Sequence, residues 1–464
     1  MIGRAERKAR RLWGFAAAVL CSTALSSAAS GETLADAFVM AYKNSPELSA
    51  GLANVRVLSE QAVQAASGGR PQVQGTINLT SQFLNLEEFI FPTTMQLDVT
   101  QTIYSGGQVE NATEAAETRI TAEQARLITT EQTVLLNTVA AYMDVRRDQT
   151  LVSLGKNNVR VINEQLRAAR ERFDVGEVTR TDVAQAESRI AAARASLAAS
   201  EGQLEISREA YKRVVGEYPG RLSPPPPLPD LPKSLDEAIA ITLTDEPTVR
   251  AARLERMAAS SDVRTAVGAL LPQVNLLGQV VNQDTLNIEN DGGTDASVGL
   301  QIIIPFYSGG FNYSNVREAQ AQVDAREADI ETALRNAAQG AGNAWSDLKV
   351  ARSSIKAGQL QVRAAQIAFD GVREEAKVGA RTTLDVLDAE QELLGARADL
   401  ATAGRDQYVA GYSVLFAVGK LTTKHLGLEL GDIESVTSYY DSVRDKNFGY
   451  TPDDDTVWSL SYRP

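Results

Sequence analysis

The chain has 464 residues, one cysteine, one histidine and a formal net charge of −13 at pH 7. This acidic balance excludes a nucleic-acid-binding protein, because such proteins present a basic surface to the phosphates. A single cysteine and a single histidine, His425, also exclude a disulfide framework and a site built from cysteine and histidine together. We expect no cofactor, no metal ion and no enzymatic activity.

Residues 1–31 are predicted to be a signal peptide. Five basic side chains precede an apolar run from Leu12 to Leu25, and small residues follow it, which is the pattern of a secretory leader. An uncleaved anchor helix and a lipid-modified Cys21 are the alternatives, but the run is short for a membrane span. Cleavage near Ser30 or Gly31 would remove five basic residues, one acidic residue and the cysteine. The mature chain would then carry 41 basic and 58 acidic residues, a net charge of −17.

The rest of the chain carries the same landmarks twice. Tyr104–Gly107 recurs as Tyr307–Gly310. Val175–Val183 has the pattern Val-Gly-x-x-Thr-x-x-Asp-Val, which recurs at Val378–Val386. Both recurrences have an offset of 203 residues. Landmarks at a constant spacing indicate an internal duplication. A unit of about 200 residues is too long for a stacked-repeat array.

Prolines divide the chain into segments. We place repeat 1 at 32–218 and repeat 2 at 234–424, joined by a proline-rich linker at 219–233 and followed by a C-terminal segment at 425–464. The run Pro224–Pro227 predicts a stiff, extended connector, although a flexible domain linker is an equal alternative. Within each repeat we expect a helix, a strand hairpin, a long helix, a tip and a returning helix.

Two stretches without proline predict very long helices. No proline occurs between Thr93 and Tyr218 or between Phe306 and Thr451, and proline inside a helix costs about 3 kcal/mol. Apolar residues at helical spacing place the helices at Gln108–Phe173 and Phe311–Ala376. Each helix would be about 100 Å long at 1.5 Å per residue. An ordinary coiled coil is the alternative for these two segments taken alone.

Each long helix is expected to end where the chain reverses, at tips of about 174–179 and 377–382. A glycine in each tip suits the left-handed conformation that commonly ends a helix, and a threonine three residues later suits the N-cap of the returning helix. The glycines are Gly176 and Gly379, and the threonines are Thr179 and Thr382.

Two strand hairpins are predicted at about 71–104 and 272–306. From Thr94 to Tyr104, apolar residues alternate with polar ones, and Gln72–Phe83 and Ser297–Phe306 repeat this pattern, whereas Gln273–Ile288 follows it less regularly. Alternation over about ten residues with one polar side is typical of a membrane-barrel strand. A half-buried strand in a soluble sheet is the alternative for any one segment. The flanking long helices offer such a sheet no globular core.

Four strands cannot close a membrane barrel, because bacterial outer-membrane barrels have at least eight and open edges cannot lie in lipid. The strands must therefore come from several chains. Two copies would give eight strands and a filled interior, whereas three would give twelve and room for a lumen. The expected fold is an α+β membrane protein with a two-fold internal repeat. It combines a long α-helical coiled-coil barrel with strands from several chains shared in one membrane β-barrel.

The sequence resembles the TolC family of trimeric outer-membrane efflux and secretion ducts. The most specific matches are Ile304–Gly310 after the last strand and Val378–Asp388 at the second tip, and the resemblance extends over about residues 32–430. It implies a homotrimer in outer-membrane lipid, with strands shared in a trimeric 12-stranded outer-membrane β-barrel and with the coiled-coil helices in a periplasmic barrel. It also implies a mixed belt around that barrel, built here from about 216–233 and 425–464.

The resemblance also implies the function and the partners. Such ducts are the exit of a tripartite efflux pump or a type I secretion system. They are opened at the periplasmic tip by a membrane-fusion adaptor and an inner-membrane transporter of the RND, ABC or MFS class. The cell outer membrane of a Gram-negative bacterium, with a periplasmic extension, is the implied location. The exported substrate stays open between drugs and proteins.

The resemblance assigns roles at the tips. Asp385 and Asp388 match the family's acidic ring, and Arg381 and Asp182 match a lock between neighbouring tips. Docking of the adaptor is implied at the two turns, which comprise Val175, Gly176, Glu177, Val378, Gly379 and Ala380.

Two departures from the family pattern change the expected lock. The family's lock tyrosine is here Ala376, and an arginine that pairs with the acidic ring is here Gly404, with Arg405 beside it. The lock is therefore expected to be weaker and to rest on Arg381 with Asp182. A solvated charge pair is the alternative for Asp385 and Asp388.

Two other functions share part of the pattern. A passive outer-membrane porin would need the strands but has no use for helices of this length. A periplasmic coiled-coil adaptor would need the helices but not the alternating strands.

Overall fold

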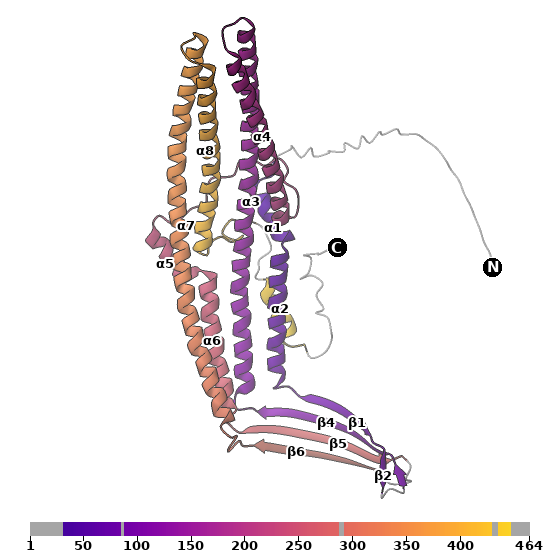
Figure 1. The fold of residues 1–464 in the computed structure, drawn as a ribbon. Coiled ribbons are helices and arrows are strands. Elements are labelled where there is room, and N and C mark those ends of the chain that lie inside the picture. The colour runs from indigo at the N-terminus through magenta and orange to yellow at the C-terminus, as the bar shows by residue number, and fades with distance from the viewer. Residues whose placement is uncertain (1–30, 85–87, 287–291, 429–434, 447–464) are drawn as a thin grey trace, which may run out of the picture.

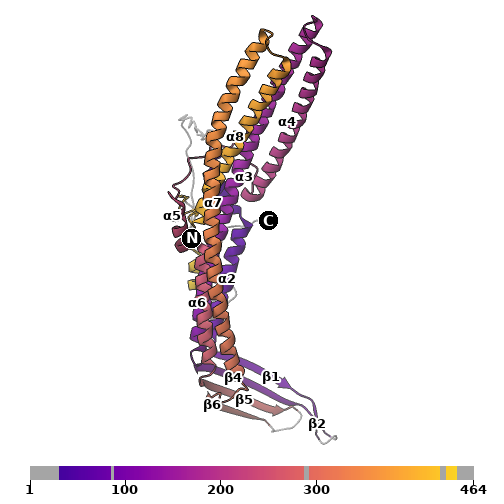
Figure 2. The same ribbon diagram turned by 60° about the vertical axis from the view of Figure 1, so that its left-hand side comes forward.

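The computed structural model describes residues 31–84, 88–286, 292–428 and 435–446. The predicted leader, except for Gly31, and much of the predicted C-terminal belt segment therefore lie outside the described residues. The described chain is strongly elongated (Figures 1 and 2). A β-sheet lies at one end, a shaft of helices runs from it, and two helical hairpins form the opposite end.

Apart from the short strands β2 and β3 and the helix α9, the elements follow the same order in both halves of the chain. Helices α1 and α5 have 11 residues each, α2 and α6 have 22, and α3 and α7 have 67. The first half comprises α1 (Leu34–Asn44), α2 (Pro46–Ser67), β1 (Gln72–Leu79), β2 (Gln82–Leu84), β3 (Glu88–Ile90), β4 (Pro92–Tyr104), α3 (Gln108–Asp174) and α4 (Arg180–Val215). The second half comprises α5 (Leu235–Asp245), α6 (Pro247–Gly268), β5 (Gln273–Thr285), β6 (Gly293–Ile303), α7 (Phe311–Lys377), α8 (Thr383–Ala417) and α9 (Ser435–Val443).

Local signals fix where the helices begin and end. Helices α3 and α7 start where predicted and end one residue later than predicted. The single helix expected before each hairpin is two helices, because Ser45 and Glu246 each cap a helix whose first residue is proline. Proline suits that first position, since its missing N–H would have no partner there.

The main sheet is antiparallel, with the strand order β1-β4-β5-β6. Strand β4 pairs with β5 from Pro92 opposite Thr285 onward, which joins the two hairpins into one sheet. Two predicted boundaries were wrong. Strand β1 ends at Leu79, and Gln82–Leu84 forms a separate ribbon with β3. Strand β6 runs from Gly293 to Ile303 rather than from Ser297 to Phe306, because Pro305 has no N–H to continue the ladder.

The two faces of the sheet differ in chemistry, as the alternation predicts. Met95, Leu97 and Val99 of β4 are exposed on one face, whereas Gln96 and Asp98 lie on the other. The paired register continues each face across the sheet. Further exposed apolar side chains on the strands are Val73, Ile77, Leu276, Val280, Val298, Leu300 and Ile302.

The main apolar core lies along α3. It includes the fully buried Leu135 and Tyr142 of α3, with Tyr211 of α4 and Leu415 of α8 packed into the same cluster. Helix α3 therefore contacts both halves of the chain. Among the described helices, none combines the length and apolar content that a membrane span requires.

The N-terminal residues of the described chain lie along the linker between the halves. Glu32 forms a parallel bridge with Leu222, and the Ser223 N–H donates to the Glu32 carbonyl at 2.9 Å. The Tyr142 hydroxyl donates to the Ser223 carbonyl oxygen at 2.7 Å and ties these two bridged segments to α3. The linker is thus extended and bound to the shaft along this stretch.

Helix α9 packs against α2 of the shaft. The hydroxyl of Tyr439 donates to Glu60 at 2.7 Å, and that of Tyr440 donates to Glu117 at 2.7 Å. His425, the first residue of the C-terminal segment, is exposed. The described part of the C-terminal segment therefore lies along the first half of the chain.

Candidate gate at the helical tips

The two tips lie at the end of the molecule farthest from the sheet (Figures 1 and 2). We call α3 with α4 coil 1, and α7 with α8 coil 2. Each coil is a hairpin of two helices, and its turn is one of the predicted docking turns. Val175 and Val378 at these turns are strongly exposed.

Both turns close the preceding helix in the same way. Gly176 has φ +80° and Gly379 has φ +76°, the left-handed region in which glycine is unstrained. The N–H groups of Glu177 and Ala380 each donate back at 2.9 Å to the carbonyl five residues earlier. Together with the bonds from the glycine N–H groups, this is a Schellman motif. No heavy atom lies within 4 Å of a Cβ added at either glycine, so the glycines are required for φ rather than for space.

Both returning helices begin with a reciprocal capping box. Thr179 caps α4, and the Asp182 carboxylate accepts from the Thr179 N–H at 2.8 Å and from its hydroxyl at 2.9 Å. Thr382 and Asp385 repeat the arrangement at α8, with both distances 2.9 Å. These hydrogen bonds, the one from the backbone N–H first, lower the pKa of Asp385 below its ordinary value. Asp385 is therefore held as a carboxylate.

Arg381 contacts a carboxylate of its own coil. Its Nε lies 2.9 Å from Oε2 of Glu375, on the other side of the turn. This hydrogen bond and the charge of Glu375 raise the pKa of Arg381. The expected pair of Arg381 with Asp182 stays a prediction, since it would join the tips of neighbouring chains.

Asp388 contacts the other coil of the same chain. The guanidinium of Arg189, on α4, lies 2.7 Å from the Asp388 carboxylate on α8. Leu387, the preceding residue, is buried in an apolar cluster formed otherwise by α3 and α4. The two coils are thus joined near the tips by one ion pair and one apolar contact.

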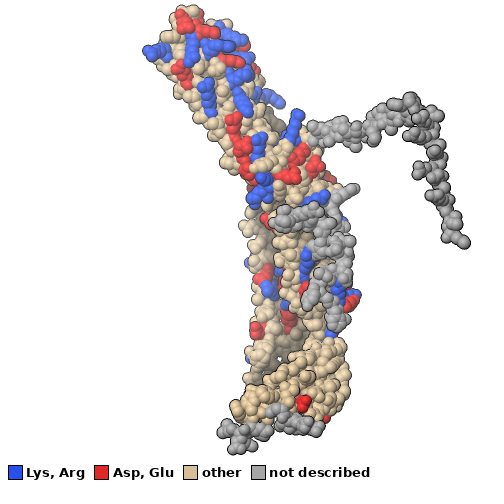
Figure 3. Space-filling model, turned by 90° about the vertical axis from the view of Figure 1, so that its right-hand side faces the viewer, with Lys and Arg blue, Asp and Glu red and all other residues tan. Residues whose placement is uncertain are grey.

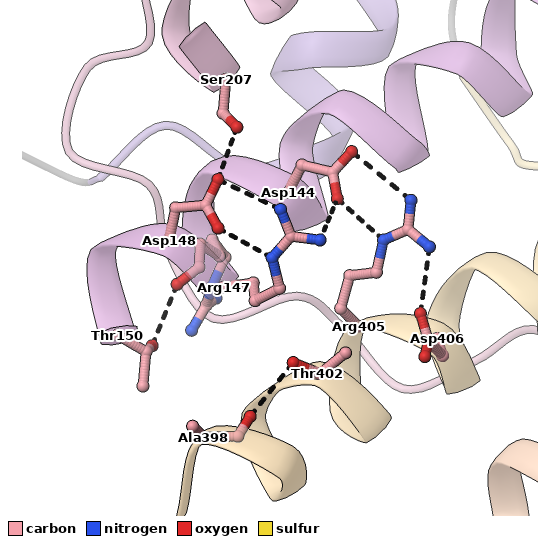
Figure 4. Close-up of polar contacts among 10 residues, drawn as sticks. Asp144, Arg147, Asp148, Thr150, Ser207, Ala398, Thr402, Arg405 and Asp406 are labelled. Carbon is pink, nitrogen blue, oxygen red and sulfur yellow. Dashed lines mark hydrogen bonds and ion pairs between the residues drawn. The ribbon is translucent and has the colours of Figure 1, made fainter. Parts of the chain in front are cut away.

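The departures at Ala376 and Gly404 leave their positions without the family's polar groups. Ala376 is partly buried against the apolar cluster of coil 2, and open space surrounds Gly404. Arg405 does not replace the missing arginine at the tip. Its Nε lies 2.8 Å from Asp144 of α3, and Nη1 lies 3.0 Å from Asp406 (Figure 4).

The contacts of Arg405 belong to a network that joins three helices. Arg147 lies 3.0 Å from Asp144 and 2.7 Å from the fully buried Asp148, to which Ser207 of α4 donates (Figure 4). The bond to Asp148 is the main reason that the pKa of Arg147 is raised. This network connects α3, α4 and α8 well below the tips.

Charge is distributed unevenly along the molecule. Figure 3 shows charged side chains crowded over the helical tips, whereas the sheet end is almost free of them. The sequence contains no lysine or arginine between Arg70 and Arg119, or between Arg264 and Arg317, the two segments that contain the strands. The visible charge on the sheet is therefore acidic.

Sequence reasoning missed three features of the tips: the contact of Arg381 with Glu375, that of Asp388 with Arg189, and the burial of Glu390 on α8. The spacing Thr-x-x-Asp could have identified the capping boxes. No local signal could have paired Arg189 with Asp388, because 199 residues separate them.

Comparisons with known proteins agree with this architecture. A family model described as outer membrane efflux protein matches residues 38–217 and 238–420. The outer membrane efflux protein BepC of Brucella suis is 38% identical over 441 residues, which cover 94% of this chain and 96% of BepC. The outer membrane protein TolC of Escherichia coli is 25% identical over 436 residues, covering 88% of this chain and 86% of TolC.

Solved structures share the fold at low sequence identity. The CmeC outer membrane channel of Campylobacter jejuni has a TM-score of 0.76 against this chain at 18% identity, with 88% of this chain and 89% of CmeC covered. The MtrE outer membrane channel of Neisseria gonorrhoeae has a TM-score of 0.72 at 22% identity, with 84% of this chain and 90% of MtrE covered. The family match extends over both halves of the chain. The chain therefore belongs to the outer membrane efflux protein family.

Proposed function

We propose that this outer-membrane efflux protein forms a homotrimer in which three copies close one continuous duct. The observation that carries the proposal is the four-stranded sheet with one apolar face. In the part of the chain that the structure describes, β1 and β6 each pair with one strand only, so both ends of the sheet are edges. Edges cannot lie in lipid. Three sheets joined edge to edge would close a 12-stranded barrel with the apolar face toward lipid.

The helices would extend the duct into the periplasm. Residues 32–218 and 234–424 are treated as the two repeats, each supplying one coil to a helical barrel of six coils. The extended linker at 219–233 and the C-terminal segment at 425–464 would form the belt around it. The Glu32–Leu222 bridge and the contacts of α9 support this placement.

The duct would be the exit of a larger machine. Relatives include BepC, an outer membrane efflux protein, and AprF of Pseudomonas aeruginosa, an alkaline protease secretion protein. We infer that a periplasmic membrane-fusion adaptor contacts the turns at Val175–Glu177 and Val378–Ala380. An inner-membrane transporter of the RND, ABC or MFS class would supply the substrate. Both turns are exposed and lie opposite the membrane end, which supports this role.

The tips would form the gate. Three copies of Asp385 and Asp388 would place six carboxylates around one narrow lumen, where they repel each other and attract cations. Arg381 and Asp182 would hold neighbouring tips together.

The trimer is tested by mass measurement in detergent. Native mass spectrometry of the protein extracted from outer membranes should give three times the mass of the mature chain. A stable monomer in the membrane would overturn the proposal. Recordings in planar bilayers separate the duct from a passive porin, because a closed tip should keep the conductance low. Recovery in the soluble periplasmic fraction would favour the adaptor.

A further inference from the structure

The contact between the two coils of one chain is built from two adjacent residues of α8. The Asp388 side chain is 56% exposed and pairs with Arg189, which is 42% exposed, at 2.7 Å. Leu387 beside it is 4% exposed. It lies in a cluster with Ile162 and Leu166 of α3 and with Ala186 and Ile190 of α4. A polar and an apolar contact therefore hold the same turn of α8 against coil 1.

The arginines assigned to the tip from the sequence have other partners. Arg381 pairs with Glu375 of its own coil. Arg405 pairs with Asp144 in the network below the tips. Gly404 has no side chain to offer. Within the described chain, the partner of the Asp388 carboxylate is thus an arginine of the other repeat, at a position that the sequence analysis did not assign.

We propose that Arg189 and Leu387 form a brace that keeps coil 2 on coil 1 within each chain, and that opening of the tip must release it. This inference rests on the proposed gate function. Arg189 acts as a positioning residue: it holds α8 and compensates the charge of Asp388. When the brace opens, Asp388 loses this partner, and repulsion among the carboxylates of the three chains favours the open state.

The expected effect follows from the exposure of the pair. An exposed ion pair shifts an equilibrium by up to about fivefold. If three copies release together, the factors multiply to about 100-fold at most. High salt should reduce the effect, because the pair is open to solvent.

Charge reversal tests the brace in single-channel recordings of the full-length protein. Arg189→Asp and Asp388→Arg should each raise the fraction of open ducts by about fivefold to 100-fold at low salt. The double variant, with the charges exchanged, should return to low conductance. A purely structural role of either residue would not give this rescue.

The chain supplies a matched control. Arg170 and Glu187 form an ion pair at 2.6 Å with similar exposure, but both lie within coil 1. Arg170→Asp should leave the conductance of the closed duct unchanged. Equal effects of Arg170→Asp and Arg189→Asp, or no rescue in the exchanged pair, would overturn the brace.

A crosslink gives an independent test. The only cysteine is Cys21 in the predicted leader, so two introduced cysteines would be the only ones in the mature chain. Arg189→Cys with Asp388→Cys, joined by a reducible thiol crosslinker, should hold the duct closed even when Arg381→Ser is also present. Reduction should then open it. High conductance before reduction would exclude the brace.

Failure of the brace can be separated from failure of the gate. If Arg381→Ser opens the duct but Arg189→Asp behaves as the control does, the gate stands and the brace is wrong. If neither variant changes conductance, the tip is not the gate and both proposals are wrong.

Discussion

Helices α3 and α7 have the same length and the same kind of ends, but they have different surroundings. Both have 67 residues, a left-handed glycine before the first turn and a Schellman motif after the last. Helix α3 has 21 buried residues, whereas α7 has 8. Helix α3 packs against α1, α2, α4, α6 and α8, and α7 packs against α5, α6 and α8. Similar signals at the two ends thus give helices of the same length, and tertiary contacts make α3 the central one.

The exposed face of α7 is not simply polar. Leu360 and Ile367 are 63% and 68% exposed and lie seven residues apart, on one face of the helix. An apolar face of this kind on a long helix is expected to contact another copy of the chain. In the proposed trimer, α3 would thus form the core inside one chain, and α7 would form part of an interface between chains.

The largest effect on stability is expected from truncating a leucine of α3, and a leucine of α7 provides the comparison. Leu135 of α3 is fully buried, so Leu135→Ala should lower the free energy of unfolding by about 2–5 kcal/mol per chain. Leu360→Ala should leave each chain folded but lower the temperature at which the trimer dissociates. Circular dichroism measures unfolding, and gel migration after heating in SDS measures dissociation. An unchanged trimer in Leu360→Ala would remove the proposed interface on α7.

The next prediction compares the protein with a variant that lacks one buried carboxyl group of α3. Burial raises the pKa of Glu131, although hydrogen bonds from the N–H and hydroxyl of Thr423 oppose the shift. The folded chain thus binds this proton more tightly than the unfolded chain, so stability falls as pH rises from the ordinary carboxyl range through the raised pKa. Glu131→Gln keeps an acceptor for Thr423 and cannot ionise. Its Tm should exceed that of the unaltered protein at pH 7.

The pH dependence is the control for this effect. Below about pH 4 the carboxyl is protonated in both states, so the Tm difference due to ionisation should vanish. Parallel Tm curves for the two proteins between pH 4 and pH 8 would contradict the assignment to Glu131.

A smaller effect is expected from the caps, and it should be equal in the two coils. Thr179→Ala and Thr382→Ala should each cost about 1 kcal/mol locally, because each removes the hydroxyl of a capping box. Hydrogen exchange of the first-turn amides of α4 and α8 should quicken to a similar extent. Thr402→Ala in mid-α8 is the control, since its hydroxyl donates only to the Ala398 carbonyl. Faster exchange in one coil alone would show that the tips differ in more than sequence.

The smallest energetic change is expected at the exposed charges of the second tip. Arg381→Ser should raise conductance, because it removes an attractive charge and leaves the carboxylates. Asp385→Ala combined with Asp388→Ala should reduce cation selectivity and block by multivalent cations. Bilayer recordings with unchanged conductance in the first and unchanged selectivity in the second would exclude these residues from the gate.

The sequence predicted the family, the long helices and the tips because their signals are local. Glycine at a left-handed position, threonine at an N-cap and the absence of proline each act within a few residues, and the ends of α3 and α7 were predicted to within one residue. Alternation located the sheet but misplaced β6, since Ile304 and Phe306 continue the pattern beyond the last ladder bond. The trimer and the duplication stay predictions.

The partners of the charged residues could not be predicted in the same way. Arg381 pairs across a turn with Glu375, and Arg189 pairs with a residue of the other repeat. The second contact depends on how the two coils pack, and both contacts depend on which rotamer a long side chain adopts. An arginine on a helix rich in charged residues has many carboxylates as candidate partners, and sequence spacing alone does not show which of them it contacts.

Both ends of each tip turn are closed, by a Schellman motif on one side and a capping box on the other. These hydrogen bonds oppose fraying of the tip, so in the proposed gate we expect the coil to move as a stiff lever. About 22 residues of α8 separate Arg405 from the turn, or about 33 Å at 1.5 Å per residue. Rotation by about 10° at the Arg405–Asp144 contact would carry the tip through about 6 Å over that length. If the tips form the proposed gate, small changes in packing at mid-shaft would thereby produce a wide displacement at the mouth of the duct.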